Sequence, residues 1–412
     1  MKARRLLLGI LLLPLVVVAV AIVVGCVVWS PTYVYRCLAW GQSDIRDCDR
    51  FPYRGVGNEP PVFHFARGPE NNVVSDLFDD IEYRSKGKKT RIGDLDDFLK
   101  ANDTTGFIVI KDDAIWYENY FNGYTRDSVN TSFSMAKSFT SALIGIAIGE
   151  GFIEGVDDPV TKYLPELEGK GFDAVTIKHL LLMASGIKYV ENGTPWGDDA
   201  RTYYDPDLRR VALEAPITAP VGKYFLYNNY HPMFLGMILE RATGKPVAQY
   251  LEEKIWKPLG MEYPASWSID SEESGFEKME SGINARAIDF AKFGRLFLNR
   301  GRWDGQQIVL EEWVAESTRR DRSRENPDYY AFAAFNRDFF ASGKGYYKYM
   351  WWGYTRDEEN DDFIACGHLG QFIYVCPAHD VIIVRNGKTT GAVDMWTGVL
   401  FAMASALGNE GK

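Results

Sequence analysis

The longest apolar run of the chain lies near its N-terminus. Residues 6–29 form a stretch of 24 uncharged, mostly apolar residues, and Lys2, Arg4 and Arg5 precede it. This exceeds the roughly 20 residues that a helix needs to cross a bilayer, whereas the apolar core of a cleaved signal peptide has about 7–15. The pattern predicts a basic cytoplasmic stub at residues 1–5 and a single-pass membrane anchor at residues 6–29, with the rest of the chain exported.

Two alternatives for this run stay open. Residues 19–21 read Ala-Val-Ala, like a signal-peptide cleavage site, and residues 23–26 read Val-Val-Gly-Cys, like a lipoprotein signal. All three interpretations export the body of the chain. It is therefore expected in the periplasm or the extracellular space.

An exported chain can carry disulfides. Cys37 and Cys48 lie eleven residues apart in a short segment after the apolar run and are the preferred pair. Cys366 and Cys376 are the second candidate, although ten residues along one straight strand would span about 33 Å, too far for a bridge. Cys26 lies within the apolar run and reads as a small apolar residue.

Strand and helix patterns begin after a polar segment. Residues 30–90 are irregular and dotted with Pro and Gly, which predicts an extracytoplasmic linker that wraps around the body. Residues 106–121 predict two strands joined by a turn at 111–113. Residues 133–150 are apolar on almost every side, which predicts a helix buried in a large core.

The middle of the chain reads as helical and its end as stranded. Helical patterns closed by glycine recur through residues 152–290. The chain is therefore expected to form one domain over residues 91–412, with a helical subdomain roughly at 152–290. The further helices are expected at residues 178–183, 230–242, 285–299 and 393–407, and the late strands at 346–354, 362–366, 371–376 and 381–385.

Composition and charge exclude several classes of protein. With 46% hydrophobic and 25% charged residues, the chain is neither disordered nor fibrous. A formal net charge of -10 lacks the basic surface of a nucleic-acid binder, so no nucleic-acid partner is expected. Five His and five Cys with no HExxH or CxxC motif predict neither a metal site nor a cofactor.

A Ser-x-x-Lys motif occurs three times, at Ser85, Ser134 and Ser185. Ser134-Met-Ala-Lys137 alone stands at the start of the buried helix, where the two side chains share a face. Free N–H groups and the positive end of the helix dipole there can stabilise an oxyanion. Burial and the dipole should lower the pKa of Lys137, so that it can act as a neutral base toward Ser134.

A Tyr-x-Asn motif also occurs three times. The first two copies, at Tyr117 and Tyr120, lie on the early hairpin, where Tyr is a common strand residue. The third, Tyr227-Asn-Asn229, lies in a loop before an amphipathic helix, and such loops favour catalytic groups. A phenolate near a cationic Lys is a plausible base, and an Asn amide can hold a substrate carbonyl.

The order Ser134-x-x-Lys137 and then Tyr227-x-Asn229 resembles the serine β-lactamase and penicillin-recognising superfamily, above all its class C and esterase branch. The resemblance covers roughly residues 95–407 and implies an α/β (α+β) fold, with an antiparallel sheet flanked by helices and an all-α subdomain. The active site would lie between the two. Supporting stretches are residues 157–166, 177–186, 285–294 and 367–375.

The third motif departs from the superfamily's common Lys-Thr-Gly. The matching strand reads His368-Leu-Gly370, which resembles esterase, peptidase and amide-hydrolase members, including the 6-aminohexanoate-dimer hydrolases. The missing cation weakens the case for a β-lactam carboxylate. By analogy Gly370 lets the backbone approach substrate and the N–H of Gln371 is the second oxyanion donor, although the register could slip by one or two residues.

The resulting hypothesis is acyl transfer to Ser134. Lys137 and Tyr227 would remove its proton, and Asn229 and His368 would orient the substrate, a small ester or amide or a peptide. A cell-wall D-Ala-D-Ala peptidase or β-lactamase is the second reading. A catalytically silent binding or sensor module on the same scaffold is the third.

Overall fold

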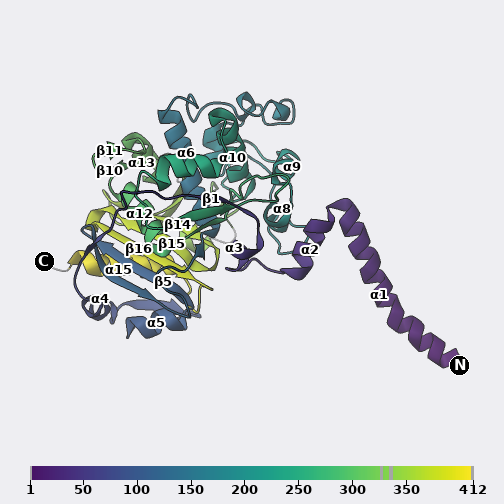
Figure 1. Ribbon diagram of the computed structural model, residues 1–412, viewed down its shortest axis with the longest axis horizontal. Coiled ribbons are helices and arrows are strands. Elements are labelled where there is room, and N and C mark those ends of the chain that lie inside the picture. Colours follow the sequence, from purple (N-terminus) through teal and green to yellow (C-terminus); the bar gives the residue numbers. More distant parts are fainter. Residues whose placement is uncertain (1, 325–327, 334–336, 410–412) are drawn as a thin grey trace.

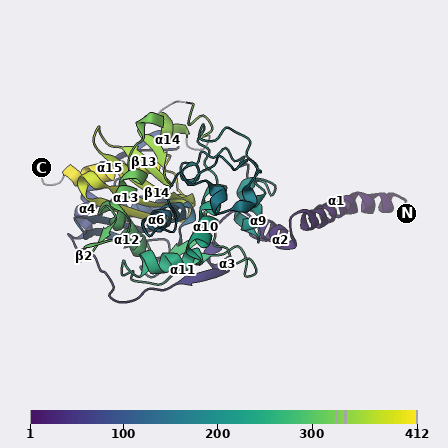
Figure 2. The same ribbon diagram turned by 90° about the horizontal axis from the view of Figure 1, so that it is seen from above.

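The computed structural model describes residues 2–324, 328–333 and 337–409 of the chain. A central sheet lies between layers of helices, and helix α1 (Lys2–Val28) projects away from this body (Figure 1). The same projection is seen from above in Figure 2.

The central sheet has eight strands in the described part of the chain. Their order is β12-β13-β14-β15-β16-β5-β6-β2, and all neighbours are antiparallel except β2, which pairs parallel with β6. The inner strands β5 and β16 are buried almost throughout, as expected of a sheet covered on both faces. The bounds are β2 (Ala66–Arg67), β5 (Thr104–Lys111), β6 (Ala114–Tyr120), β12 (Gly345–Lys348), β13 (Trp351–Thr355), β14 (Asp361–Gly367), β15 (Gln371–Cys376) and β16 (Val381–Gly387).

Side chains alternate between the two faces of the sheet along each strand, so neighbouring residues show which helix covers which face. Ile373 and Ile382 face Gly294 of α12, where an added β-carbon would come within 3.0 Å and 2.8 Å of them. Glycine therefore lets this helix lie close to the sheet. Phe372, one residue from Ile373, packs on Trp396 of α15 on the other face. The flanking helices are α4 (Asn71–Phe78), α5 (Leu95–Ala101), α6 (Ala136–Gly149), α12 (Ala287–Leu298), α13 (Glu311–Thr318) and α15 (Trp396–Asn409).

The subdomain expected at residues 152–290 is helical but not purely so. Strands β8 and β9 lie inside those bounds and join a second sheet of order β1-β8-β9-β7. Both strands are short, so their pattern was too brief to read against the surrounding helices. The helices are α7 (Ile177–Leu181), α8 (Asp198–Tyr204), α9 (Leu208–Leu213), α10 (Tyr230–Thr243) and α11 (Val247–Leu251), and the strands are β1 (Tyr53–Val56), β7 (Asn130–Thr131), β8 (Ala265–Ser268) and β9 (Ile283–Ala285).

The segment at residues 30–90 is more ordered than its composition predicted. Ser30 caps α2 (Pro31–Ala39) by accepting a hydrogen bond from the N–H of Tyr33, and Pro31 occupies the first helical position. Tyr33 and Phe51 are buried against Tyr204 of α8, so the segment is anchored by aromatic packing. Its other elements are α3 (Asp47–Arg50), β3 (Glu82–Ser85) and β4 (Lys88–Arg91), and the remaining small elements of the chain are α14 (Arg337–Ala341), β10 (Arg302–Trp303) and β11 (Gln306–Gln307).

One expected strand is a hairpin. Residues 346–354 divide into β12 and β13, joined by a turn at Tyr349 and Met350 with φ values of 43° and 66°. Two-residue hairpin turns favour Asn and Gly for these left-handed conformations. An aromatic-Met turn gives no such signal in the sequence, and burial of both residues holds it in place.

The N-terminal prediction needs correction. Among the helices of the described residues, none is long and apolar enough to cross a bilayer. The anchor predicted at residues 6–29, and the membrane-anchored location that depended on it, are therefore wrong for the part of the chain described.

The disulfide prediction is also wrong, because all five cysteines are free. The thiol of Cys48 donates to the carbonyl of Ile45 at 3.3 Å, whereas Cys37 interacts with Tyr33. Cys366 and Cys376 lie on adjacent strands, but Cys366 pairs with Phe372 near the turn of the hairpin and Cys376 lies at its far end.

Phe139 provides a test of the core between α6 and α12. Its ring is fully buried and stacks on Phe293 with centroids 3.6 Å apart. Replacing Phe139 with Ala should lower the free energy of unfolding by about 3–5 kcal/mol, because a cavity replaces the ring. Urea denaturation measures this, with the 44% exposed Phe152 as a matched Phe→Ala control. Equal losses for the two variants would contradict this packing.

Candidate active site

Ser134 lies in a tight 3₁₀ turn, Phe133–Met135, that leads into α6. Phe133 adopts φ +44°, a left-handed conformation that is strained for a bulky side chain. Its ring packs edge-on against His368, with centroids 5.6 Å apart. The end of β14 presses on the same turn, since a β-carbon on Gly367 would come within 2.2 Å of the Ser132 carbonyl. One stretch distant in sequence, residues 367–368, thus packs against the turn that carries Ser134.

Lys137, one helical turn later, is 1% exposed. Its amine donates to Ser134 Oγ at 2.9 Å, to Asn229 Oδ1 at 3.0 Å and to the Glu280 carbonyl at 2.8 Å. Burial lowers the pKa of Lys137 to about 7, because the ammonium loses its hydration and the nearby carboxylates of Glu280 and Glu191 offset only part of that loss. The amine is therefore available in its neutral, proton-accepting form near neutral pH.

Tyr227 brings a phenol to the same place. Its ring lies 5.1 Å from Lys137 Nζ and is held by Tyr347 and Trp352, with ring centroids 5.9 Å and 5.3 Å away. Burial raises the pKa of Tyr227 well above its usual value, although the hydroxyl of Ser134 acts in the opposite direction. The phenol keeps its proton near neutral pH and can donate it.

The side-chain amide of Asn229 is hydrogen-bonded to other side chains of the protein. Its carbonyl oxygen accepts from Lys137, and its amide donates to Tyr189 Oη at 3.0 Å and Thr202 Oγ1 at 3.1 Å. These contacts orient the Lys137 amine and tie it to the helical subdomain.

The His368-Leu-Gly370 segment divides into a part at the site and a part behind it. His368 is exposed and lines the cavity beside Ser134. Gly370, at φ +81°, leaves room for Arg385, whose Nη1 donates to its carbonyl at 2.6 Å. Gln371 is buried, and its amide donates to the Gly387 carbonyl at 2.7 Å. The side chain of Gln371 is thus bonded to Gly387, and Arg385 fills the space beside Gly370.

The other Ser-x-x-Lys serines have different surroundings. Ser185 Oγ lies 2.6 Å from Nε2 of His231. Both residues are at most 1% exposed, and burial lowers the pKa of His231 to about 3. No substrate reaches this pair. Ser85 lies on β3, distant in sequence from any other residue of the site.

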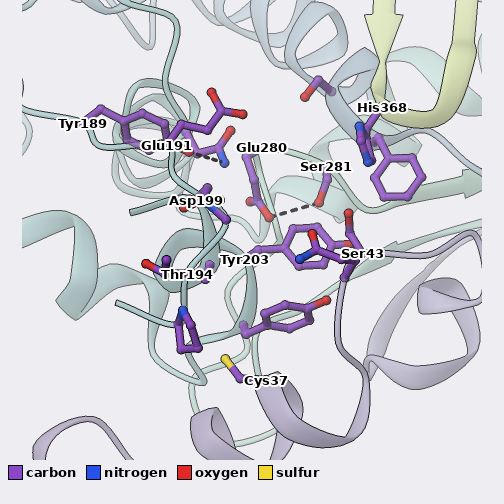
Figure 3. Close-up of a pocket in the computed structure, with 18 of the residues that line it drawn as sticks. Cys37, Ser43, Tyr189, Glu191, Thr194, Asp199, Tyr203, Glu280, Ser281 and His368 are labelled. Atoms are coloured by element: carbon purple, nitrogen blue, oxygen red, sulfur yellow. Dashed lines mark hydrogen bonds between the residues drawn. The ribbon is translucent and has the colours of Figure 1, made fainter. Parts of the chain in front are cut away.

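A cavity of about 310 Å³ opens onto Ser134 (Figure 3). One wall comes from the segment before the predicted domain, through Cys37, Gly41, Gln42 and Ser43. Sequence reasoning missed this wall because the segment has no catalytic motif. Its aromatic residues were the available signal in the sequence that the segment packs against the body.

Buried polar contacts attach that wall to the body. Arg36 donates to the carbonyls of Tyr204 at 2.9 Å and Asp270 at 2.7 Å, and Tyr203 Oη donates to Asp47 at 2.7 Å. Because these donors and acceptors are satisfied by partners in the helical subdomain, the segment is part of the site's architecture.

Three carboxylates also went unnoticed in the sequence. Glu191, Asp199 and Glu280 line the cavity together with Ser134. They are far apart in the chain and belong to no motif. Within the described residues, no group of three or more His, Cys, Asp or Glu side chains could hold a metal ion.

Comparison with known proteins gives consistent matches. The Beta-lactamase family profile matches residues 96–399. The chain is 27% identical over 312 residues to a 6-aminohexanoate-dimer hydrolase of Paenarthrobacter ureafaciens, covering 72% of this chain and 75% of that protein. It is 34% identical over 150 residues to Esterase EstB of Burkholderia gladioli, covering 32% and 38%. A Bacillus anthracis structure provisionally assigned as a 6-aminohexanoate-dimer hydrolase superposes with TM-score 0.73 at 26% identity, covering 90% of this chain and 93% of that one.

The lowered pKa of Lys137 predicts how Ser134 reacts with pH. Labelling of Ser134 by a fluorophosphonate should speed up as pH rises through about 7, because the neutral amine that accepts the Ser134 proton is populated above that value. Below it the ammonium form cannot accept a proton. Rates measured from pH 5 to 9 test this, and a rate that is flat across the range would contradict the assignment of Lys137 as the base.

Proposed function

From the premise that the chain belongs to the beta-lactamase family and is a serine hydrolase, we propose that it cleaves small esters or amides through an acyl-enzyme on Ser134. The observation that carries the proposal is the 2.9 Å hydrogen bond between the buried amine of Lys137 and Ser134 Oγ. A neutral amine at this distance can take the hydroxyl proton as the oxygen attacks.

The steps follow from the contacts of the three side chains. Ser134 Oγ bonds to the substrate carbonyl carbon while its proton passes to Lys137 Nζ. The C–O or C–N bond of the substrate then breaks, and the protonated phenol of Tyr227 supplies the leaving group with a proton, which Lys137 returns to Tyr227. Water hydrolyses the acyl-enzyme by the same route in reverse. The backbone N–H groups of Ser134 and Gln371 are the proposed oxyanion donors.

The lining of the cavity favours esters and amides over β-lactams and D-Ala-D-Ala peptides. Both of the latter carry a carboxylate, yet among the described residues no Lys or Arg lines the cavity. His368 stands where many members of the superfamily carry a lysine motif, which weakens anion binding further. Similarity to an esterase and to an amide-cleaving dimer hydrolase supports the same substrate class. The intact Ser134–Lys137 contact argues against a silent binding module.

Ser134→Ala should abolish covalent labelling by a fluorophosphonate probe, because no other serine has a buried amine bonded to its hydroxyl among the described contacts. Ser85→Ala is the matched control, since Ser85 begins another Ser-x-x-Lys motif, and it should label at the rate of the unmodified protein. Mass spectrometry of the labelled peptide identifies the site. Persistent labelling of Ser134→Ala would mean a different nucleophile.

Three substrates separate the candidate activities. p-Nitrophenyl butyrate should be hydrolysed with kcat/KM at least about 100-fold above that for nitrocefin or a D-Ala-D-Ala peptide, since the cavity offers those anions no cation. Absorbance assays measure the first two and released D-Ala the third. A preference for nitrocefin or the peptide would overturn the proposed substrate class.

A further inference from the structure

The loop between β8 and β9 holds a buried ion pair beside Lys137. Lys278 Nζ donates to Glu280 Oε1 at 2.8 Å, and the two side chains are 1% and 2% exposed. The backbone carbonyl of Glu280 in turn accepts from Lys137 Nζ at 2.8 Å. The ion pair and the amine that bonds to Ser134 therefore meet at one residue.

The contacts of the Lys278 amine suit a positive charge. Nζ also donates to the Tyr203 carbonyl, and it lies 4.0 Å from the centre of the Tyr203 ring and 4.4 Å from that of the Phe51 ring. Carbonyl oxygens and the faces of aromatic rings both attract an ammonium. Burial lowers the pKa of Lys278, whereas the carboxylate of Glu280 raises it. The structure thus pairs an ammonium with a carboxylate in a dry environment.

The N-terminal segment covers this pair without favouring either charge. Phe51 lies over the Lys278 amine. After burial and Glu280, the next influences on the pKa of Lys278 are Arg36, which lowers it, and Asp47, which raises it. Because these two effects oppose each other, Glu280 is the carboxylate that balances the charge of Lys278.

Glu280 depends on Lys278 in the same way. Its Oε1 accepts from Lys278 and, at 3.0 Å, from Ser281 Oγ, a contact drawn in Figure 3. Its Oε2 is buried and has no hydrogen-bond partner among the described atoms. A buried ion pair adds little to stability because desolvation offsets the attraction, yet loss of one partner leaves an uncompensated charge. The pair is therefore better explained by its effect on a neighbour than by stability.

The other titratable groups near Lys137 carry no charge near neutral pH. The ring of Tyr227, in the loop before α10, lies 5.1 Å from Lys137 Nζ, and burial raises the pKa of this phenol. His231 of α10 interacts with Lys137 as well, and burial lowers the pKa of His231 to about 3. Cys366 of β14 interacts with Tyr227, and burial raises the pKa of its thiol. All three groups are neutral, so they do not set the charge of Lys137.

Three charged groups remain among the described neighbours of Lys137. Burial lowers the pKa of Lys137, Glu280 and Glu191 raise it, and Lys278 lowers it. Glu191 is exposed, so water screens its charge, whereas the Lys278–Glu280 pair is dry and acts more strongly. The charge balance within this pair therefore decides whether Lys137 is favoured as an amine or as an ammonium.

We infer that Lys278 is a positioning residue for Lys137 and acts through Glu280. It balances the Glu280 carboxylate, holds the loop whose carbonyl accepts from Lys137, and keeps the Lys137 amine able to accept the proton of Ser134. The inference rests on the proposed function. It adds to that function a residue that neither bonds to Ser134 nor lines the cavity.

Charge variants of the pair test this through the pH dependence of acylation. Lys278→Gln leaves the Glu280 charge unbalanced, so the pH midpoint of fluorophosphonate labelling at Ser134 should rise by about one pH unit. Glu280→Gln leaves the Lys278 charge unbalanced, and the midpoint should fall by a similar amount. The double variant restores neutrality and should return the midpoint to within about 0.3 pH unit of the unmodified protein.

Steady-state kinetics separate this role from substrate binding. For p-nitrophenyl butyrate, Lys278→Gln should lower kcat about tenfold at pH 6 and leave it almost unchanged at pH 9, where Lys137 is neutral in both proteins. KM should stay within about twofold, because Lys278 does not line the cavity. A loss of kcat that is equal at both pH values would mean a merely structural role and would overturn the inference.

A second buried pair provides the matched control. Lys292 Nζ lies 3.4 Å from Asp289 Oδ1, and both side chains are fully buried. Lys292→Gln should lower the urea midpoint as Lys278→Gln does, yet leave the pH midpoint of labelling unchanged, because neither member of this pair acts on Lys137. An equal change of the pH midpoint in the two variants would contradict a specific role of Lys278.

The outcomes also separate this inference from the proposed function. Urea denaturation shows which variants are folded, and if Lys278→Gln is not, the isosteric Glu280→Gln takes its place. A folded variant whose pH midpoint does not move, while Ser134 is still labelled and the ester is still cleaved, would overturn the inference and leave the hydrolase assignment intact. If the unmodified protein neither labels at Ser134 nor cleaves p-nitrophenyl butyrate, the proposed function fails and the inference fails with it.

Discussion

The burial of one amine is the constraint on which the site depends. Lys137 emerges from a buried, mostly apolar helix at 1% exposure, and its three hydrogen bonds reach Ser134, Asn229 and Glu280. An isolated buried ammonium would be very costly, so these acceptors and the lowered pKa belong together. The same burial that makes Lys137 difficult to accommodate makes it a base near neutral pH.

That amine also joins the two halves of the molecule. Ser134 and Lys137 belong to α6 against the main sheet, Asn229 precedes α10 in the helical subdomain, and Glu280 lies in the loop before β9. Loss of any one partner would leave the amine with an unfilled hydrogen bond in a dry environment. The Lys137 amine therefore links the surroundings of Ser134 to the contact between the two halves.

The N-terminal segment changes the shape of the site without contributing to its chemistry. Through Cys37, Gly41, Gln42 and Ser43 it closes a side of the cavity, and Arg36 fixes it to the helical subdomain. Aromatic packing of Tyr33 and Phe51 on Tyr204 offsets the loss of conformational entropy when this segment is ordered, although its composition is typical of a linker. The segment therefore shapes the space beside Ser134, while in the proposed mechanism α6 and Tyr227 supply the reacting groups.

The sequence by itself determined the elements whose signals are local. The early hairpin, the buried helix after Ser134, the helices α10 and α12 and the strands β14 to β16 follow from hydrophobic periodicity and closing glycines. The juxtaposition of Ser134 and Lys137 follows from helical spacing. Tertiary structure decided what no local pattern encodes: the buried turn at Tyr349 and Met350, the free cysteines, the use of Asn229 to orient Lys137, and the carboxylates around the cavity. Each of these depends on contacts between residues far apart in the chain, and such contacts exist only once the core has packed.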